Sequence, residues 1–256
     1  MAKPEQVELQ PLADRVWAAL APELWDALPR VTYDWQRASQ NLEEKLQSLF
    51  PPGPISEPLD PVERNLALRK RIALKLASAG VEELYPLFVG IVRGWGRIGG
   101  GKKGKDDPLR AWAQELEGFA PETVKRFLDK WGVERVSSWS KILAFADSER
   151  YAIYDTRVAL TLNIGLRAIG DCRQFHLPVS RSKLVFRASA VLGTVDRPLG
   201  YLDYLAFLRA VVSQRAETLL SAETALFAAA PPLAAGLMSE IDSHLNQGCA
   251  ISCRGS

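Results

Sequence analysis

The hydrophobic positions of this chain recur mainly with the period of an α-helix. From Pro121 to Trp131, apolar side chains fall at i, i+3, i+4 and i+7, and Gly132 follows as a helix-ending residue. Similar stripes predict helices over residues 60–80, 137–146 and 202–212. Alternation with period two is confined to a brief extended stretch at residues 151–154. The pattern therefore predicts an all-α fold.

Two stretches interrupt the helical pattern. Residues 51–58 contain four prolines and predict a linker that follows an N-terminal helical layer over about residues 1–58. Residues 93–107 contain six glycines and five basic residues, which predict a basic loop. We expect a single domain over residues 1–256, with two helical lobes.

The composition fits a protein that folds without disulfides or metals. The chain has 256 residues, 47% of them hydrophobic, and a net charge of +2 that gives no overall sign of a nucleic-acid partner. Its three cysteines indicate a reducing compartment and suit neither a zinc site nor an iron–sulfur cluster. The first residues lack a signal-peptide core, and Pro231-Pro232 break the longest apolar stretch, residues 225–238. We expect a cytoplasmic protein.

The segment most informative about function is residues 121–163. A helix ends there at Trp131-Gly132, a short turn follows, and a second helix is expected to begin with Ser137 or Ser138 as its cap. A loop then delivers Tyr154-Asp155-Thr156-Arg157 at the start of another helix. Backbone N–H groups at such a hairpin point toward one spot and suit a phosphate oxygen.

This segment resembles the helix-hairpin-helix DNA glycosylases, most closely their 8-oxoguanine glycosylase-like branch. Gly132-Val133 corresponds to the Gly-Val-Gly hairpin of that family, and residues 153–157 correspond to the motif around its invariant aspartate, here Asp155. The resemblance implies two helical lobes with the active site in the cleft between them. It also implies that the partner is double-stranded DNA containing a modified base. Separately from the resemblance, we expect no cofactor, metal, membrane or obligatory protein partner.

Three positions depart from the family pattern. Glu134 lies where the hairpin has its second glycine, and Arg157 replaces a histidine. Without gaps, the position of the family's nucleophilic lysine falls on Val136, whereas Lys141 lies about one helical turn further along. Lys141 is therefore either the nucleophile of a bifunctional enzyme, or it takes no part in a monofunctional reaction in which Asp155 activates water. The ungapped register slightly favours the monofunctional reaction.

The chemistry explains why these residue types are needed. Breaking an N-glycosidic bond builds positive charge on the sugar, which a carboxylate such as Asp155 stabilises. A desolvated lysine can attack the sugar and form a Schiff base. A flipped base needs a pocket with aromatic walls, and the candidates for it are Trp95, Trp139, Tyr151 and Tyr154. Asp155 is also a preferred N-cap residue, so a purely structural role competes with catalysis.

Candidate DNA contacts fall into two groups. The hairpin and the aspartate motif contribute Gly132, Val133, Ser137, Ser138 and Arg157. The basic loop contributes Arg93, Arg97, Lys102, Lys103 and Lys105. A weaker basic cluster contains Arg173, Arg181, Lys183 and Arg187.

The substrate and the class of function have alternatives. The family branch implies excision of an 8-oxoguanine-type lesion, and an anti-phage relative would instead excise a hypermodified base such as glucosylated hydroxymethylcytosine. The departures at Glu134 and Val136 motivate a second class, a helix-hairpin-helix protein that binds DNA without catalysis. A helical protein that binds other proteins is the third.

Overall fold

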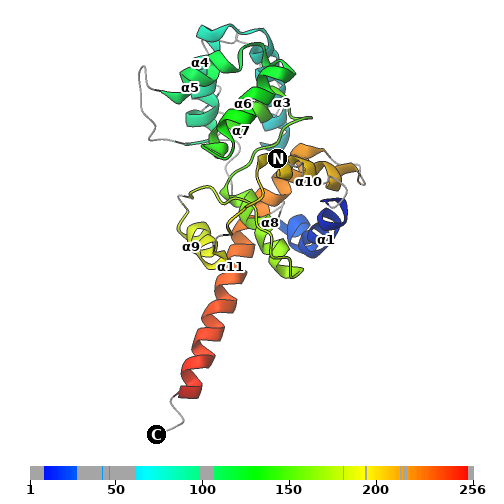
Figure 1. The fold of residues 1–256 in the computed structure, drawn as a ribbon, viewed down its shortest axis with the longest axis vertical. Helices are drawn as coiled ribbons and strands as arrows, with labels where there is room; N and C mark the ends of the chain where they lie inside the picture. The colour runs from blue at the N-terminus through cyan, green and yellow to red at the C-terminus, as the bar shows by residue number, and fades with distance from the viewer. Residues whose placement is uncertain are drawn as a thin grey trace. The chain divides into compact units, whose positions relative to one another are not determined.

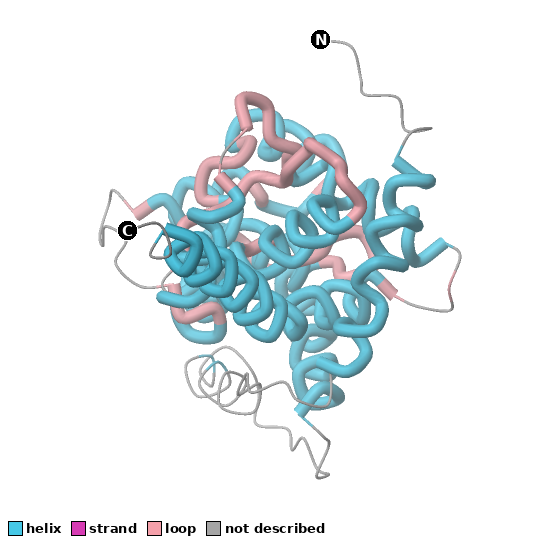
Figure 2. The backbone as a smooth tube through the Cα atoms, turned by 90° about the horizontal axis from the view of Figure 1, so that it is seen from below, coloured by secondary structure: helices cyan, strands magenta, loops and turns pink. Residues whose placement is uncertain are grey.

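The described residues of this computed structural model are almost entirely helical. They are residues 9–27, 42, 46, 61–98, 107–180, 182–193, 195–213, 215 and 218–252. Within them, the β structure is limited to an isolated bridge between Phe175 and Leu199, and Figure 2 shows helices and loops without a strand. The prediction of an all-α protein is confirmed for this part of the chain.

The chain divides into two compact units. The middle unit comprises residues 32–153, and the terminal unit combines residues 1–31 with residues 154–256. The expected N-terminal layer over residues 1–58 is therefore divided between the units. The reason is that helix α1 (Leu9–Ala27) packs against helices from the C-terminal part of the chain, where Gln10 Nε2 donates to the Ala210 carbonyl at 3.0 Å.

The middle unit is a set of short helices (Figure 1). In chain order they are α3 (Pro61–Ser78), α4 (Val81–Val89), the π-helix η4 (Gly90–Trp95), α5 (Pro108–Glu115), the 3₁₀ turn η5 (Glu117–Phe119), α6 (Pro121–Trp131) and α7 (Val136–Ala146). Helix α7 packs against α3 and η4, and α4 packs against α5 and η4. Ile72 and Leu76 of α3 and Ile142 and Leu143 of α7 are fully buried, as their helical spacing predicts.

The prediction that the basic loop begins at Arg93 is wrong. Residues 90–95 are helical, and Ile91, Val92 and Trp95 turn inward, with exposed fractions of 0%, 3% and 3%. The glycines of this stretch suggested a loop from Arg93 onward, but a buried helical turn also needs small residues where another element comes close. Lys102, Lys103 and Lys105 lie outside the described residues.

The terminal unit is built around one long helix. Its elements besides α1 are α8 (Thr156–Ala168), α9 (Lys183–Leu192), α10 (Tyr201–Ser213) and α11 (Leu219–Ser252). Helix α11 packs against all four others, and its C-terminal part extends beyond them (Figure 1). Small residues such as Ala222, Ala225 and Ala229 are fully buried on α11, so neighbouring helices approach it closely.

Pro231 and Pro232 do not interrupt α11, contrary to the expected break in the apolar stretch. Among the described residues, Leu219–Ser243 is the one helical segment long and apolar enough to cross a membrane. This is weak evidence for a membrane, because buried core helices of soluble proteins have the same composition, and 39% of its most apolar window is buried inside the protein.

Candidate functional site

The hairpin between α6 and α7 is a tight turn with unusual backbone angles. Gly132 ends α6 with φ 50° and ψ −118°, a combination that residues with a Cβ rarely adopt. Arg135 has left-handed angles (φ 54°, ψ 25°) and caps α7, which begins at Val136. The expected serine cap is therefore wrong: α7 begins before Ser137 and Ser138.

The turn is exposed but held firmly to α7. Trp139 Nε1 donates to the Glu134 carbonyl at 2.8 Å, and the Val133 side chain remains 42% exposed. Within the described residues, the backbone N–H groups of Val133 and Arg135 form no hydrogen bond. An anion approaching the turn would meet these donors, although it would also meet the exposed Glu134 carboxylate, whose Oε1 lies 3.6 Å from Arg135 Nε.

Lys141 lies inside the middle unit on α7. It is 4% exposed, and its Nζ donates to the Ser137 carbonyl at 2.6 Å. Gly96 makes room for it, because a Cβ on Gly96 would lie 2.8 Å from Lys141 Cδ. Lysine is rarely buried to this extent, so its position needs an explanation.

A second buried cation lies at the same junction of α3, α7 and η4. The Arg69 guanidinium is 5.4 Å from the ring centroid of Trp95 and 5.1 Å from that of Phe145, and Arg69 is 2% exposed. The sequence analysis missed Arg69. Arg69 could have been identified by its position, because among the several arginines of α3 it lies on the apolar stripe of the helix.

Arg93, an expected DNA contact, is occupied within the protein. Its Nη2 lies 2.7 Å from Asp107 Oδ2, and the Asp107 side chain is fully buried. The same carboxylate accepts from the Tyr85 hydroxyl at 3.0 Å and caps α5 through the Leu109 N–H at 3.1 Å. The Arg93–Asp107 ion pair therefore joins the first and last residues of the stretch 93–107. Arg97 is exposed, with φ 49°.

Asp155 is the N-cap of α8 in the terminal unit. Its Oδ1 accepts from the N–H groups of Arg157 at 3.0 Å and Val158 at 3.2 Å. The residue is half-buried. The structural role that competed with catalysis is thus present, and it leaves Oδ2 outside these two bonds.

Beneath the start of α8 lies a buried polar cluster that the sequence analysis missed. Tyr204 is fully buried, and burial followed by the negative charges of Glu223 and Asp155 raises its pKa well above the usual range. Glu223, on the first turns of α11, is only 3% exposed. It was detectable as the single acid in the apolar run from Leu219 to Ala230.

Arg157, the other residue of the aspartate motif expected to contact DNA, lies beside the same helix. Its guanidinium is 4.6 Å from the ring centroid of Phe227, one turn after Glu223 on α11. A carboxylate, a phenol, a cation and an aromatic ring are therefore grouped around Asp155 within the terminal unit.

The expected base-pocket residues differ in burial. Trp139 and Tyr154 are 0% exposed and Trp95 is 3% exposed, so all three are core side chains here. The Tyr154 hydroxyl donates to the His176 carbonyl at 2.6 Å, and burial raises its pKa. Tyr151 is half-buried and lines a cavity of about 210 Å³ with Phe119 and the Asp147–Arg150 ion pair. A role in holding a base stays a prediction for all four.

The comparisons with known proteins add no relative. No protein family, curated protein or solved structure matches the chain.

Within the described residues no group of three or more metal-ligating side chains comes together. Lys141 and the hairpin belong to the middle unit and Asp155 belongs to the terminal unit.

Proposed function

We propose that the protein is a DNA glycosylase with the helix-hairpin-helix fold, which flips a modified base out of double-stranded DNA and excises it. The order of features supports this proposal. A tight hairpin joins α6 to α7, α7 carries Lys141, and the next helix begins at the half-buried Asp155. Phosphate would bind at the hairpin, and the reacting sugar would lie near the carboxylate.

The observation that carries the proposal is the burial of Lys141. Transferring an ammonium group from water into a protein interior costs free energy unless partners compensate for it. Here the chain also requires Gly96 beside the lysine stem. The Ser137 carbonyl accepts one hydrogen bond from the amine, and we attribute the choice of a lysine rather than an apolar residue at this buried position to chemistry.

In the proposed reaction, the neutral Lys141 amine, released from the Ser137 carbonyl, forms a bond to C1′ of the flipped nucleotide as the bond from C1′ to the base breaks, and the base leaves with a proton from the amine. The C1′–O4′ bond then opens, O4′ takes the remaining amine proton, and the C1′=N Schiff base forms. Asp155 stabilises the positive charge that develops on the sugar. In the monofunctional alternative, Asp155 activates water instead and Lys141 forms no adduct. The cap role of Asp155 supports a further candidate, a DNA-binding protein without catalysis, because capping alone accounts for an aspartate here.

The test is a single-turnover assay on duplexes that carry 8-oxoguanine or glucosylated hydroxymethylcytosine, together with an unmodified duplex. Mild alkali reveals abasic sites, and borohydride traps any Schiff base. We expect base release from one modified duplex and a trapped adduct that peptide mapping assigns to Lys141. Lys141→Ala should lose the adduct, whereas the control Lys125→Ala, an exposed lysine of α6, should keep it.

The alternatives give different results in this assay. Base release without an adduct, retained in Lys141→Ala, identifies the monofunctional enzyme and removes Lys141 from the chemistry. Duplex binding without base release from any substrate overturns the glycosylase proposal in favour of the non-catalytic protein. The modified base that is released decides between a repair substrate and a phage base.

A further inference from the structure

Helix α9 of the terminal unit has one buried face and one exposed face. Val185 and Ala188 are 1% and 0% exposed and pack against Leu160 of α8 and Ala234 and Leu237 of α11. These contacts account for the inward face of α9. The outward face is therefore available for another role.

The outward face combines cations with exposed apolar side chains. Phe186 is 57% exposed and Val191 36% exposed, and Val179, shortly before the helix, is 93% exposed. Lys183 and Arg187, also exposed, lie at i and i+4, with Phe186 between them. Residues three or four apart are neighbours on a helix surface, so Lys183 lies next to both Arg187 and Phe186, and the aromatic ring lies beside the pair of cations.

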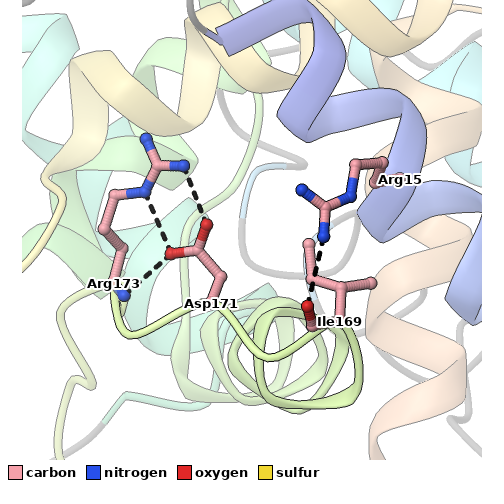
Figure 3. A network of polar contacts seen from close by, with 4 residues as sticks. All are labelled: Arg15, Ile169, Asp171 and Arg173. Atoms are coloured by element: carbon pink, nitrogen blue, oxygen red, sulfur yellow. Dashed lines mark hydrogen bonds and ion pairs between the residues drawn. The ribbon is translucent and has the colours of Figure 1, made fainter.

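The charge of this region is of one sign. Between Asp171 and Asp196 the sequence contains Arg173, Arg181, Lys183 and Arg187 and no acidic residue. Arg173 forms three hydrogen bonds with the Asp171 carboxylate, as Figure 3 shows, so its charge is compensated locally. None of the ion pairs among the described residues involves Lys183 or Arg187.

We propose that this face of α9, defined by Lys183, Phe186 and Arg187, binds duplex DNA. Charge complementarity selects the partner: the two uncompensated cations match neighbouring phosphates, whose counterions they release. Phe186 adds an apolar surface for a sugar or for a base exposed by flipping. This inference rests on the proposed function, which supplies DNA as the partner, and it adds a DNA-binding surface outside the hairpin and outside the Asp155 cluster.

The test measures the affinity of the full chain for an unmodified fluorescent duplex between 50 and 200 mM salt. Lys183→Ala with Arg187→Ala should reduce the slope of log affinity against log salt by roughly 0.9 for each phosphate that the variant no longer neutralises. Phe186→Ser should weaken binding about fivefold and leave the slope unchanged, because no charge is removed. All three side chains are exposed, so these variants should fold.

A charge-matched control separates a local effect from a change of net charge. Lys70→Ala with Arg167→Ala removes two exposed cations from α3 and α8, and it should leave slope and affinity unchanged. An equal decrease of the slope in this control, or an unchanged slope in the α9 variant, overturns the proposal. Binding of anionic vesicles or of polyglutamate in preference to the duplex would assign the face to another partner.

Failure of this inference is distinguishable from failure of the proposed function. Duplex affinity is measured without a modified base, whereas the glycosylase is tested by base release. A wild-type protein that releases base with an α9-independent salt slope overturns only the present inference. A protein that shows the α9-dependent slope and never releases base overturns only the glycosylase.

Discussion

Lys141 and Asp155 lie in the same stretch of sequence but in contrasting surroundings. Lys141 is 4% exposed on α7, and its position requires a glycine beside its stem. Asp155 is half-buried at the start of α8, where its carboxylate accepts two backbone N–H bonds. The lysine is at a buried position that charged side chains rarely occupy, and the aspartate is at a helix N-cap, a position that aspartate commonly occupies.

This difference reverses the order in which the sequence alone ranks the two residues as candidates for a functional role. By motif, Asp155 is the stronger candidate and Lys141 the weaker, because the lysine lies out of register. By structure, helix capping accounts for Asp155, whereas helix formation and packing do not account for Lys141. A functional role must therefore be tested at Asp155 with a substitution that preserves the cap, and at Lys141 with one that preserves packing.

The largest expected effect is that of Asp155→Asn on base release. Asparagine caps helices about as well as aspartate, so the free energy of unfolding should change by less than about 0.5 kcal/mol. Single-turnover base release should fall at least about a hundredfold, or about 3 kcal/mol of barrier, because the substitution removes the negative charge that we propose stabilises the sugar cation.

Asp155→Ala completes the comparison. It should abolish base release and, in addition, reduce stability by about 1 kcal/mol in urea unfolding, because the cap is removed. If Asp155→Asn retains base release while Asp155→Ala is destabilised, Asp155 is a cap and nothing more.

A smaller effect is expected at Lys141, and it concerns stability. Lys141→Met keeps most of the side-chain volume and removes the buried charge, so it should raise the free energy of unfolding by about 1 kcal/mol. The exposed control Lys125→Met should change it by less than about 0.5 kcal/mol in urea unfolding. A loss of stability in Lys141→Met would mean that the amine stabilises the middle unit, and the functional explanation of its burial would no longer be needed.

Helices were predictable from the sequence where the apolar stripe and the end signals agree. The predicted helix over Pro121–Trp131 matches α6 at both ends, since proline starts it and glycine ends it. The helical turn at residues 93–95 was not predictable, because Gly96 makes room for the Lys141 side chain, a packing role that the sequence does not reveal. Pro231 and Pro232 were likewise misleading, because α11 is held to α8 before them, where Thr161 Oγ1 donates to the Leu226 carbonyl, and packs against α8 and α9 after them, at Ala234 and Leu237.

The sequence predicted those candidate-site residues that belong to one local motif, but not those that packing brings close from distant parts of the chain. Motif spacing identified Asp155 and Lys141, but Tyr204 and Glu223 reach the neighbourhood of Asp155 through the packing of α10 and α11, which no local pattern reveals. The Arg93–Asp107 pair was missed for the same reason, since the two residues lie at opposite ends of the glycine-rich stretch.

The smallest expected effect is that of a substitution at Asp171, a second carboxylate of the terminal unit, to which we assign a structural role. Asp171 follows α8 and binds Arg173, whose Nη2 lies 2.8 Å from its Oδ2, beside the Arg15 bond to the Ile169 carbonyl (Figure 3). The hydrogen bonds from Arg173 lower the pKa of Asp171 below its usual 3.8. A lowered folded-state pKa stabilises the fold above the unfolded value and ceases to do so as the pH falls through the folded one.

Asp171→Asn is therefore the benchmark against which Asp155→Asn is judged. The Arg173 side chain is 40% exposed, so water screens the pair, and the variant should be only about 0.5 kcal/mol less stable at pH 7. Thermal unfolding from pH 7 to pH 2 should show this difference shrinking below about pH 4, where the wild-type carboxylate becomes protonated too. Base release should equal that of the wild type. If Asp171→Asn reduced base release as much as Asp155→Asn, the effect at Asp155 would reflect a general disturbance of the α8 region rather than missing charge at the sugar.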